Sequence, residues 1–264
     1  MGRLYEVARS VRHMERCLRL EPCRRPILSS LQRLHRLILT KRASTMPTTL
    51  PLFPLNTVLF PGMPLPLRVF EERYLRMLEA HRDADPIFGV VLIKSGRESG
   101  SIPEVYLTGT AVSLASDRHR MSKRGNIVVT GGSRFRIHDL DWSREYGLAS
   151  IEYVNEPAPD PSEIEGVLHE TKDLLRRYVR GITRLTGRRF DHVRLPVDPV
   201  ACSWELAARL PLHSRERQSL LEQPLTADRL KALRYTLRRE LALLYGAGAA
   251  GLAMNHPGGS FTLN

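Results

Sequence analysis

The sequence is poor in cysteine, and this scarcity excludes several classes of protein. Among its 264 residues it has three cysteines, Cys17, Cys23 and Cys202. Three cysteines at these spacings make neither a disulfide framework nor a zinc-binding pattern. We therefore expect reduced thiols, a cytoplasmic location and no metal site.

Long hydrophobic runs are also missing. The longest uncharged run is LALLYGAGAAGLAM, residues 241–254, which is too short and too rich in Gly and Ala to span a bilayer. The first residues lack the order of charged, apolar and small residues that marks a signal peptide. The sequence therefore predicts no membrane partner.

Motifs for nucleotide and catalytic chemistry are absent as well. No string matches the phosphate-binding pattern G-x-x-x-x-G-K-[ST]. GAGAAG at 246–251 has the spacing of a dinucleotide fingerprint, but it follows a predicted helix rather than a strand. Ser203 and His213 could be imagined as a nucleophile and its base, yet core and loop positions explain them more simply. We expect no cofactor and no enzymatic activity.

The net charge of +12 is concentrated near the N-terminus. Residues 1–46 carry ten Arg, one Lys and three Glu, a net +8, which leaves +4 for residues 47–264. This leader is either a transit peptide or basic arm, or an upstream extension of the gene with Met46 as the true start. We favour the second interpretation and expect a leader without a fixed fold. The remaining charge is weak support for nucleic-acid binding.

Residues 47–155 have the pattern of a β-rich unit. Short apolar runs bounded by Pro and Gly predict strands that turn sharply. From Phe70 the period changes: Phe70, Tyr74, Met77 and Leu78 recur at helical spacing and predict one helix. SKRGN, at 122–126, has the composition of a turn between two strands. The predicted strands are LPLF (50–53), TVLF (57–60), LPLRV (65–69), and segments 87–93, 105–115, 126–131, 134–140 and 146–154.

Residues 156–250 have the pattern of a helical unit, and 251–264 are predicted to be a flexible tail. NEPAPDP, 155–161, is a linker by composition. A long helix is predicted to start at Ser162 as N-cap and to stop at Gly187. Two short helices, 199–210 and 214–223, and a last helix capped by Thr226 are predicted to follow. Apolar faces are formed by Ile164, Val167, Leu168, Leu174, Leu175, Tyr178, Val179 and Ile182, and by Leu230, Leu233, Leu237, Leu241 and Leu244.

Several strings together resemble the Lon N-terminal, or substrate-binding, domain. The opening LPLFPLNTVLFPGMPLPLRVFEERYLRM is similar to the start of that family, and GTAVSL, GNIVVTGGSRFRI and SWELAARLPL follow in the same order. The resemblance spans roughly residues 49–245. One departure is the turn SKRGN, where the family often has Asp-Gly followed by Arg.

The resemblance implies an α+β fold: a small PUA-like β-barrel (47–155) followed by an α-helical bundle (156–250). It implies a recognition domain standing alone, because neither the ATPase nor the Ser–Lys peptidase domain of full Lon proteases is visible in the sequence. The expected function is that of a non-catalytic polypeptide-binding module, which could serve as an adaptor in protein quality control. Its expected partners are unfolded or exposed polypeptide segments and a protease or another protein.

Three groups of residues are candidates for binding. Pro61 and Met63 belong to a turn that is predicted to be an exposed loop with an apolar tip. Arg134 and Phe135 match the Arg-Phe pair of the family and could contact ligand, although a core position for Phe135 and a carboxylate partner for Arg134, such as Glu71 or Glu72, explain them more simply.

The third group is a basic stripe on the long predicted helix. Arg176, Arg180 and Arg184 recur every four residues in a row that runs from Lys172 to Arg188, with Arg177 and Arg189 beside it. The simpler interpretation is the solvated face of an amphipathic helix. The functional alternative is an RNA-binding PUA-like module, although an aromatic content of only 6% offers few stacking platforms.

Overall fold

The computed structural model describes residues 48–81, 84, 87–98, 102–114, 126–187 and 195–254. The leader, most of the predicted SKRGN turn and residues 255–264 lie outside these ranges. The domain boundaries drawn from the sequence stay predictions. The strands are β1 (Thr48–Leu55), β2 (Pro64–Arg68), β3 (Phe88–Ser95), β4 (Glu104–Val105), β5 (Thr108–Leu114), β6 (Asn126–Asp141) and β7 (Leu148–Tyr153), and the helices are α3 (Glu72–Ala80), α4 (Pro161–Thr186), α5 (Pro199–Arg209), α6 (Ser214–Glu222) and α7 (Thr226–Met254).

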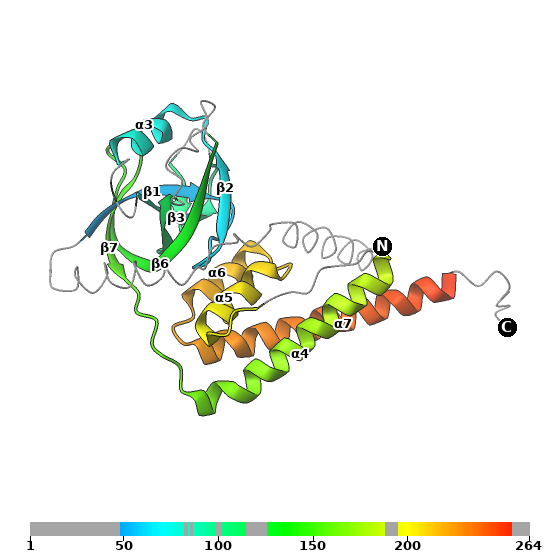
Figure 1. The fold of residues 1–264 in the computed structure, drawn as a ribbon. Coiled ribbons are helices and arrows are strands. Elements are labelled where there is room, and N and C mark those ends of the chain that lie inside the picture. Colours follow the sequence, from blue (N-terminus) through cyan, green and yellow to red (C-terminus); the bar gives the residue numbers. More distant parts are fainter. Residues whose placement is uncertain are drawn as a thin grey trace.

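Five strands close into a small barrel, as the α+β prediction requires (Figure 1). The order is β1, β7, β6, β5 and β3, and β3 returns to β1. The closing pair is parallel, with Leu52 opposite Gly89, whereas the other pairs are antiparallel. Strand β1 changes partner at its middle: Thr48–Pro51 pair with β7 and Leu52–Leu55 with β3. Closure leaves these five strands without a long free edge.

The prolines of β2 occupy its unpaired side. Met63 accepts a hydrogen bond from Gly131 of β6, so the odd-numbered residues of the segment point their backbone groups at β6. Pro64 and Pro66 therefore face away from β6, where their missing N–H groups interrupt no ladder. Among the described strands β2 pairs only with β6, so this outer edge carries carbonyl acceptors but no donors at these two residues.

Strand β6 replaces two predicted strands. Residues 126–131 and 134–140 were predicted as separate strands around a Gly-Gly turn, but they form one continuous strand. Gly131 is needed for close approach and not for a turn, because a Cβ there would lie 2.2 Å from the carbonyl oxygen of Phe60. Two further strand predictions are wrong: 57–60 is irregular, and 105–115 is divided between β4 and β5.

Helix α3 begins after Phe70 and not at it. Glu71 is the extended N-cap residue, so Phe70 lies outside the helix and is 74% exposed. Tyr74, Met77 and Leu78 form the buried face, as predicted, and pack on the barrel interior with Phe53 and Phe88.

The helical half is close to its prediction. Asp160, not Ser162, caps α4, since its carboxylate accepts from Ser162 N at 2.9 Å, and Gly187 ends the helix with a φ of 67°. Helix α7 includes Thr226 as its first residue and runs to Met254, so it extends into the predicted tail. The predicted apolar faces of α4 and α7 merge with α5 and α6 into one core.

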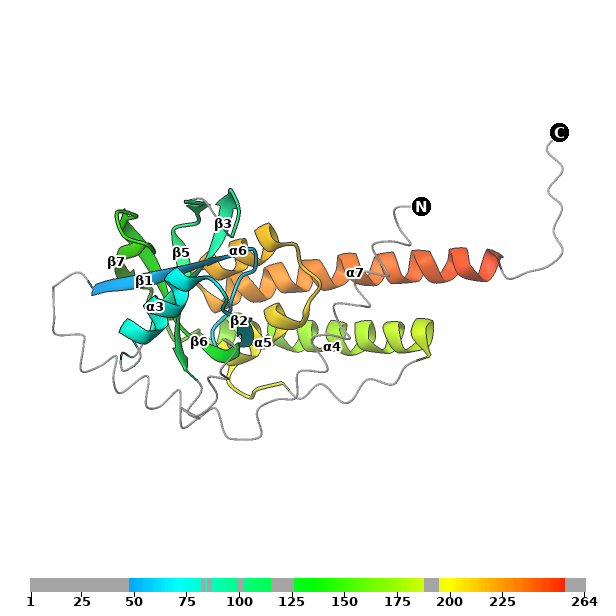
Figure 2. The ribbon, with the colours of Figure 1, turned by 90° about the horizontal axis from the view of Figure 1, so that it is seen from above.

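Helices α4 and α7 lie side by side and run in the same direction (Figures 1 and 2). Glu170 contacts Arg234 and Arg238, and further along a Cβ on Gly181 would lie 3.4 Å from Leu244. Residue numbers therefore increase together on both helices. Short helices α5 and α6 fill the space between the start of this pair and the barrel, and the pair extends beyond them (Figure 2).

Candidate functional site

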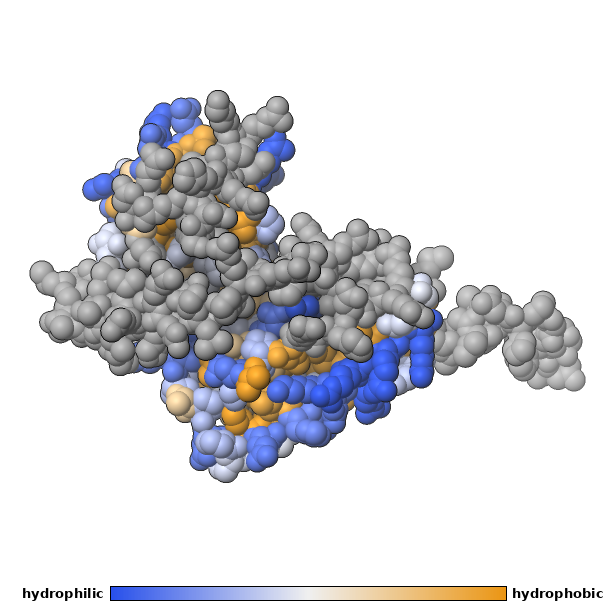
Figure 3. All heavy atoms as spheres, viewed as in Figure 1, coloured by the Kyte–Doolittle hydropathy of each residue, from blue (hydrophilic) through white to orange (hydrophobic). Residues whose placement is uncertain are grey.

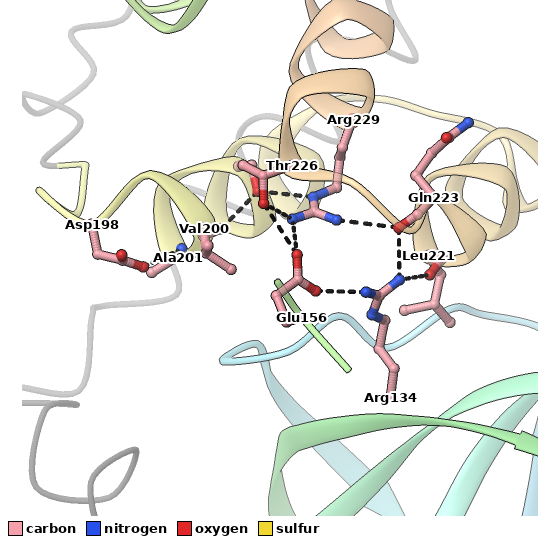
Figure 4. Close-up of polar contacts among 10 residues, drawn as sticks. Arg134, Glu156, Asp198, Val200, Ala201, Leu221, Gln223, Thr226 and Arg229 are labelled. Atoms are coloured by element: carbon pink, nitrogen blue, oxygen red, sulfur yellow. Dashed lines mark hydrogen bonds and ion pairs between the residues drawn. The ribbon is translucent and has the colours of Figure 1, made fainter. Parts of the chain in front are cut away.

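A buried polar network joins the barrel to the helices (Figure 4). Glu156, in the segment between β7 and α4, binds Arg134 Nη2 at 2.6 Å and Arg229 Nη2 at 2.7 Å. Arg134 also donates from Nη1 to the carbonyl oxygens of Leu221 and Gln223, at 2.8 and 2.7 Å. These carbonyls end α6, where a helix leaves acceptors free and favours positive charge.

The two arginines sit on one aromatic ring. The guanidinium carbons of Arg229 and Arg134 lie 3.5 and 5.1 Å from the centre of the Trp204 ring, which stacks on Phe60. Arg229 is fully buried and also donates to the Ser203 hydroxyl at 2.8 Å. Burial lowers the pKa of both guanidinium groups, and the negative charge of Glu156 opposes that effect.

This network gives the predicted Arg-Phe pair a structural place. Phe135 is fully buried in the barrel core, as the simpler interpretation predicted. Arg134 does pair with a carboxylate, but with Glu156; Glu71 instead binds Arg73 at 2.8 Å. The prediction that Arg134 and Phe135 contact a ligand stays untested, and neither side chain reaches the surface in this structure.

Ser203 and His213 do not form a catalytic pair in the described structure. The Ser203 hydroxyl donates to Val200 O at 2.6 Å and accepts from Arg229. His213 precedes α6 as its N-cap residue, and its backbone N–H donates to the Glu216 carboxylate at 2.9 Å. Both residues therefore serve local helix structure.

The turn with Pro61 and Met63 is held against both halves of the molecule. Gly62, with a φ of 77°, donates to Gly131 O at 2.8 Å, and Met63 Sδ lies 3.5 Å from Nη2 of Arg217 on α6. Pro61 and Met63 are half-buried, so the predicted exposed loop is wrong. A role of these two residues in binding stays a prediction.

An apolar surface lies directly after this turn. Burial alternates along 65–70, so Pro66 and Phe70 face outward on either side of the exposed Arg68, while Val69 is buried. Pro66 stands opposite Val128 of β6 in the register, and Val128 is 44% exposed. We call Pro66, Phe70 and Val128 the β2 face. Sequence periodicity missed it because Phe70 was assigned to the helix.

The basic stripe of α4 is exposed, and its members at four-residue spacing lie on one broad face of the helix. Arg176 binds Asp173, and Arg180 donates to the Arg176 carbonyl at 3.3 Å. Arg177, three residues before Arg180 and seven before Arg184, lies on their side of the helix. The structure thus places the predicted basic residues on the exposed face of α4, and their role in binding stays a prediction. Figure 3 shows a strongly hydrophilic surface over α4.

Neither a metal-binding cluster nor a membrane-spanning helix occurs among the described residues. No group of three or more His, Cys, Asp or Glu residues in these ranges is placed to hold a metal ion. None of the described helices combines the length and apolar character needed to cross a membrane.

Comparisons with known proteins agree on one family. A model described as the "ATP-dependent protease La (LON) substrate-binding domain" matches residues 49–239. Lon protease of Dictyoglomus thermophilum is 25% identical over 200 residues, and Lon protease of Escherichia coli K12 is 26% identical over 197. These matches cover 75% and 74% of this chain but 25% of each relative, so the chain spans about a quarter of their length.

A solved structure shares the fold. The Lon N-terminal domain protein from Xanthomonas campestris is 28% identical, with a TM-score of 0.50. The match covers 70% of this chain and 96% of that one. The barrel and the helices that follow it therefore recur together in a protein that is nearly spanned by the matched region.

Proposed function

Because this chain belongs to the LON substrate-binding domain family, we propose that it binds polypeptide segments without cleaving them. The match over residues 49–239 is the observation that carries the proposal. It covers both the barrel and the start of the helix pair, which the Glu156 network holds together. A module with a fixed arrangement of its halves can present one preorganised surface to a flexible partner.

The β2 face is the surface that we assign to apolar segments. Phe70 is 74% exposed and follows the end of the edge strand, in which Pro66 stands opposite Val128. Exposed apolar side chains of this kind lose contact with water when a partner covers them, which favours association. Pro61 and Met63 immediately precede the same strand and would help to fix its position.

The binding experiment uses the full chain and a fluorescent peptide of Leu and Phe residues spaced by Gly, Ser and Asn. We expect saturable binding, and we expect Phe70→Ser to weaken it several-fold. Ile102→Ser is the matched control, because Ile102 is also exposed, at 63%, but precedes β4. A well-folded chain that binds no such peptide would contradict the proposal.

The absence of cleavage is tested in the same samples. After long incubation with and without ATP, the mass of the peptide should be unchanged. A shortened peptide in the sample of pure chain would overturn the non-catalytic part of the proposal.

We propose an adaptor role on the same premise. A bound segment would be delivered to a separate protease or another assembly, because the region described here corresponds to the recognition part of its relatives. Crosslinking in the native host, with the Phe70→Ser variant as control, tests for such a partner. Recovery of the same proteins with both variants would contradict delivery through the β2 face.

A further inference from the structure

Two rows of side chains run along one edge of the parallel helix pair. On α4, Glu170, Arg177 and Arg184 are spaced by seven residues, and on α7, Lys231, Arg238 and Tyr245 have the same spacing. Residues seven apart lie two turns apart on one side of a helix. Contacts between Glu170 and Arg238 show that the two rows are neighbours.

The parallel direction fixes how the rows continue. Since Arg238 meets Glu170 and Gly181 faces Leu244, Tyr245 lies at the level of the α4 turns between Arg177 and Arg184. Tyr245 is 57% exposed, and Arg177 and Arg184 are exposed too. Arg180 is adjacent to both arginines on α4. We call Arg177, Arg180, Arg184 and Tyr245 the arginine edge.

The charges of the two rows are balanced at one end only. Glu170 accepts hydrogen bonds from Arg234, at 2.9 Å, and from Arg238. Along the rest of the edge, no carboxylate within the described ranges forms an ion pair with Arg177, Arg180 or Arg184. In the α4 row, the carboxylate of Glu170 is thus bound by two guanidinium groups of α7. Arg177 and Arg184, the next two residues of the row, have no such carboxylate partner in the described ranges.

We propose that the arginine edge binds the carboxylates of acidic polypeptide segments. Arginine offers a planar set of donors that fits a carboxylate. A carboxylate of the partner would bind these arginines as Glu170 binds Arg234 and Arg238 two helical turns earlier. Tyr245 supplies an exposed ring for an apolar residue beside the acid. The inference rests on the proposed function and adds a substrate class to it: segments that combine apolar and acidic residues.

A carboxylate partner fits this edge better than a nucleic acid. A protein held by the nucleic-acid backbone can make about 6–10 phosphate contacts, whereas the edge has three arginines without an ion pair to a carboxylate in the described ranges. The neighbouring surface also carries acids, Glu170 and Asp173 among them. The arginines are thus a short, local site and not a long basic track.

The experiment compares three fluorescent peptides with the full chain at low salt. They share the Leu/Phe pattern and carry Glu, Gln or Lys at the spacer positions. We expect the Glu peptide to bind about fivefold or more tighter than the Gln peptide, from two exposed ion pairs, and to lose this advantage at high salt.

Variants of the chain locate the effect. Arg177→Gln with Arg184→Gln should bring the Glu peptide to the affinity of the Gln peptide. Arg136→Gln with Arg144→Gln, on the barrel, removes the same charge and should change little. Arg177→Glu with Arg184→Glu should favour the Lys peptide instead. Because all four arginines are exposed, we expect every variant to keep the thermal unfolding midpoint of the parent chain.

Each outcome decides between explanations. Equal affinity for the Glu and Gln peptides overturns the arginine edge while the proposed function stands. Failure of all three peptides removes the proposed function itself. A single-stranded oligouridylate that binds more tightly than the Glu peptide, and loses affinity in the Arg177/Arg184 variant, overturns the acidic peptide in favour of RNA.

Discussion

Arg134 of the barrel and Arg229 of the helical half share one carboxylate, that of Glu156. One side chain comes from β6 and the other from α7, and both lie against Trp204. Buried charges tolerate few alternative arrangements, because a displaced partner would leave an unpaired charge away from water. The orientation of the barrel on the helices is therefore set by directed contacts as well as by apolar packing.

Replacing the shared carboxylate should destabilise the whole chain. In Glu156→Gln the two guanidinium groups lose their counter-charge, and we expect a loss of about 2–3 kcal/mol in the free energy of unfolding. This is below the range for a fully buried pair, since Glu156 is 23% exposed. Urea unfolding followed by circular dichroism measures the effect.

The control for this prediction is Glu165→Gln, an exposed carboxylate on α4. It should change the stability by a few tenths of a kcal/mol at most. Equal effects of the two variants would show that the shared carboxylate has no special weight.

Two glycines should respond to alanine in opposite directions. Gly131→Ala places a Cβ 2.2 Å from the backbone oxygen of Phe60, so we expect a loss of about 2–3 kcal/mol or failure to fold. At Gly166, on the exposed side of α4, a Cβ meets nothing within 4 Å, and alanine should stabilise by about 0.5–1 kcal/mol. Thermal unfolding midpoints of both variants decide the matter; a stable Gly131→Ala chain would refute the close approach.

Cys202 should be unreactive in the folded chain. Its side chain is fully buried beside Trp204, and burial raises the pKa of the thiol. Because the thiolate is the reactive form, alkylation should require unfolding. Iodoacetamide treatment in increasing urea, with peptide mapping, should label Cys202 only across the unfolding transition. Rapid labelling in buffer alone would contradict its place in the core.

Acid should weaken the helical half through its paired carboxylates. Burial by itself would raise the pKa of Glu216 and Glu170, but hydrogen bonds from Arg239 and His213 N to the first, and from Arg234 and Arg238 to the second, hold both below the ordinary value of 4.5. A lowered pKa in the folded state contributes stability above the unfolded value, and protonation removes it as the pH falls through the folded pKa.

We therefore expect the stability to decline as the pH falls from about 5 through the lowered pKa values of these carboxylates. Glu216→Gln combined with Glu170→Gln should flatten this part of the pH profile. Urea midpoints at a series of pH values test it, and an unchanged slope in the double variant would assign the acid sensitivity to other groups.

Periodicity was the most informative feature of the sequence. Leu230, Leu233 and Leu237 repeat at helical spacing because one face of α7 is buried, and all three are buried as predicted. The family resemblance added the closed barrel, which alternation alone does not reveal. Both signals are local or repeated along the chain, and that is why a single sequence carries them.

The errors fall where a residue is determined by a distant part of the chain. Phe70 fits the helical repeat, yet the chain stays extended until Glu71. Gly131 belongs to a Gly-Gly pair that is typical of a turn, but the close approach of the Phe60 backbone is what requires glycine there. Glu156 sits in a segment of linker composition, and no local pattern indicates that two arginines, 22 and 73 residues away, will meet on it.

The arginine edge shows the same limit from another side. Four-residue spacing groups Arg176 with Arg180 and Arg184, and only the position of α7 shows that Arg177 and Arg184 lie on the side of α4 nearer to that helix. Which side of a helix is free depends on the neighbour that covers the other side, and the parallel course of α4 and α7 is a property of the assembled fold.

The two prolines of β2 have a consequence for how its outer edge can associate with other strands. At Pro64 and Pro66 the outer edge of β2 can accept hydrogen bonds through its carbonyl oxygens but has no N–H group to donate. Two such edges brought together have no N–H groups at these positions to donate to each other. An extended chain that pairs with the edge there can donate hydrogen bonds to it but can accept none. The outer edge of β2 is therefore a poor template for the addition of further strands.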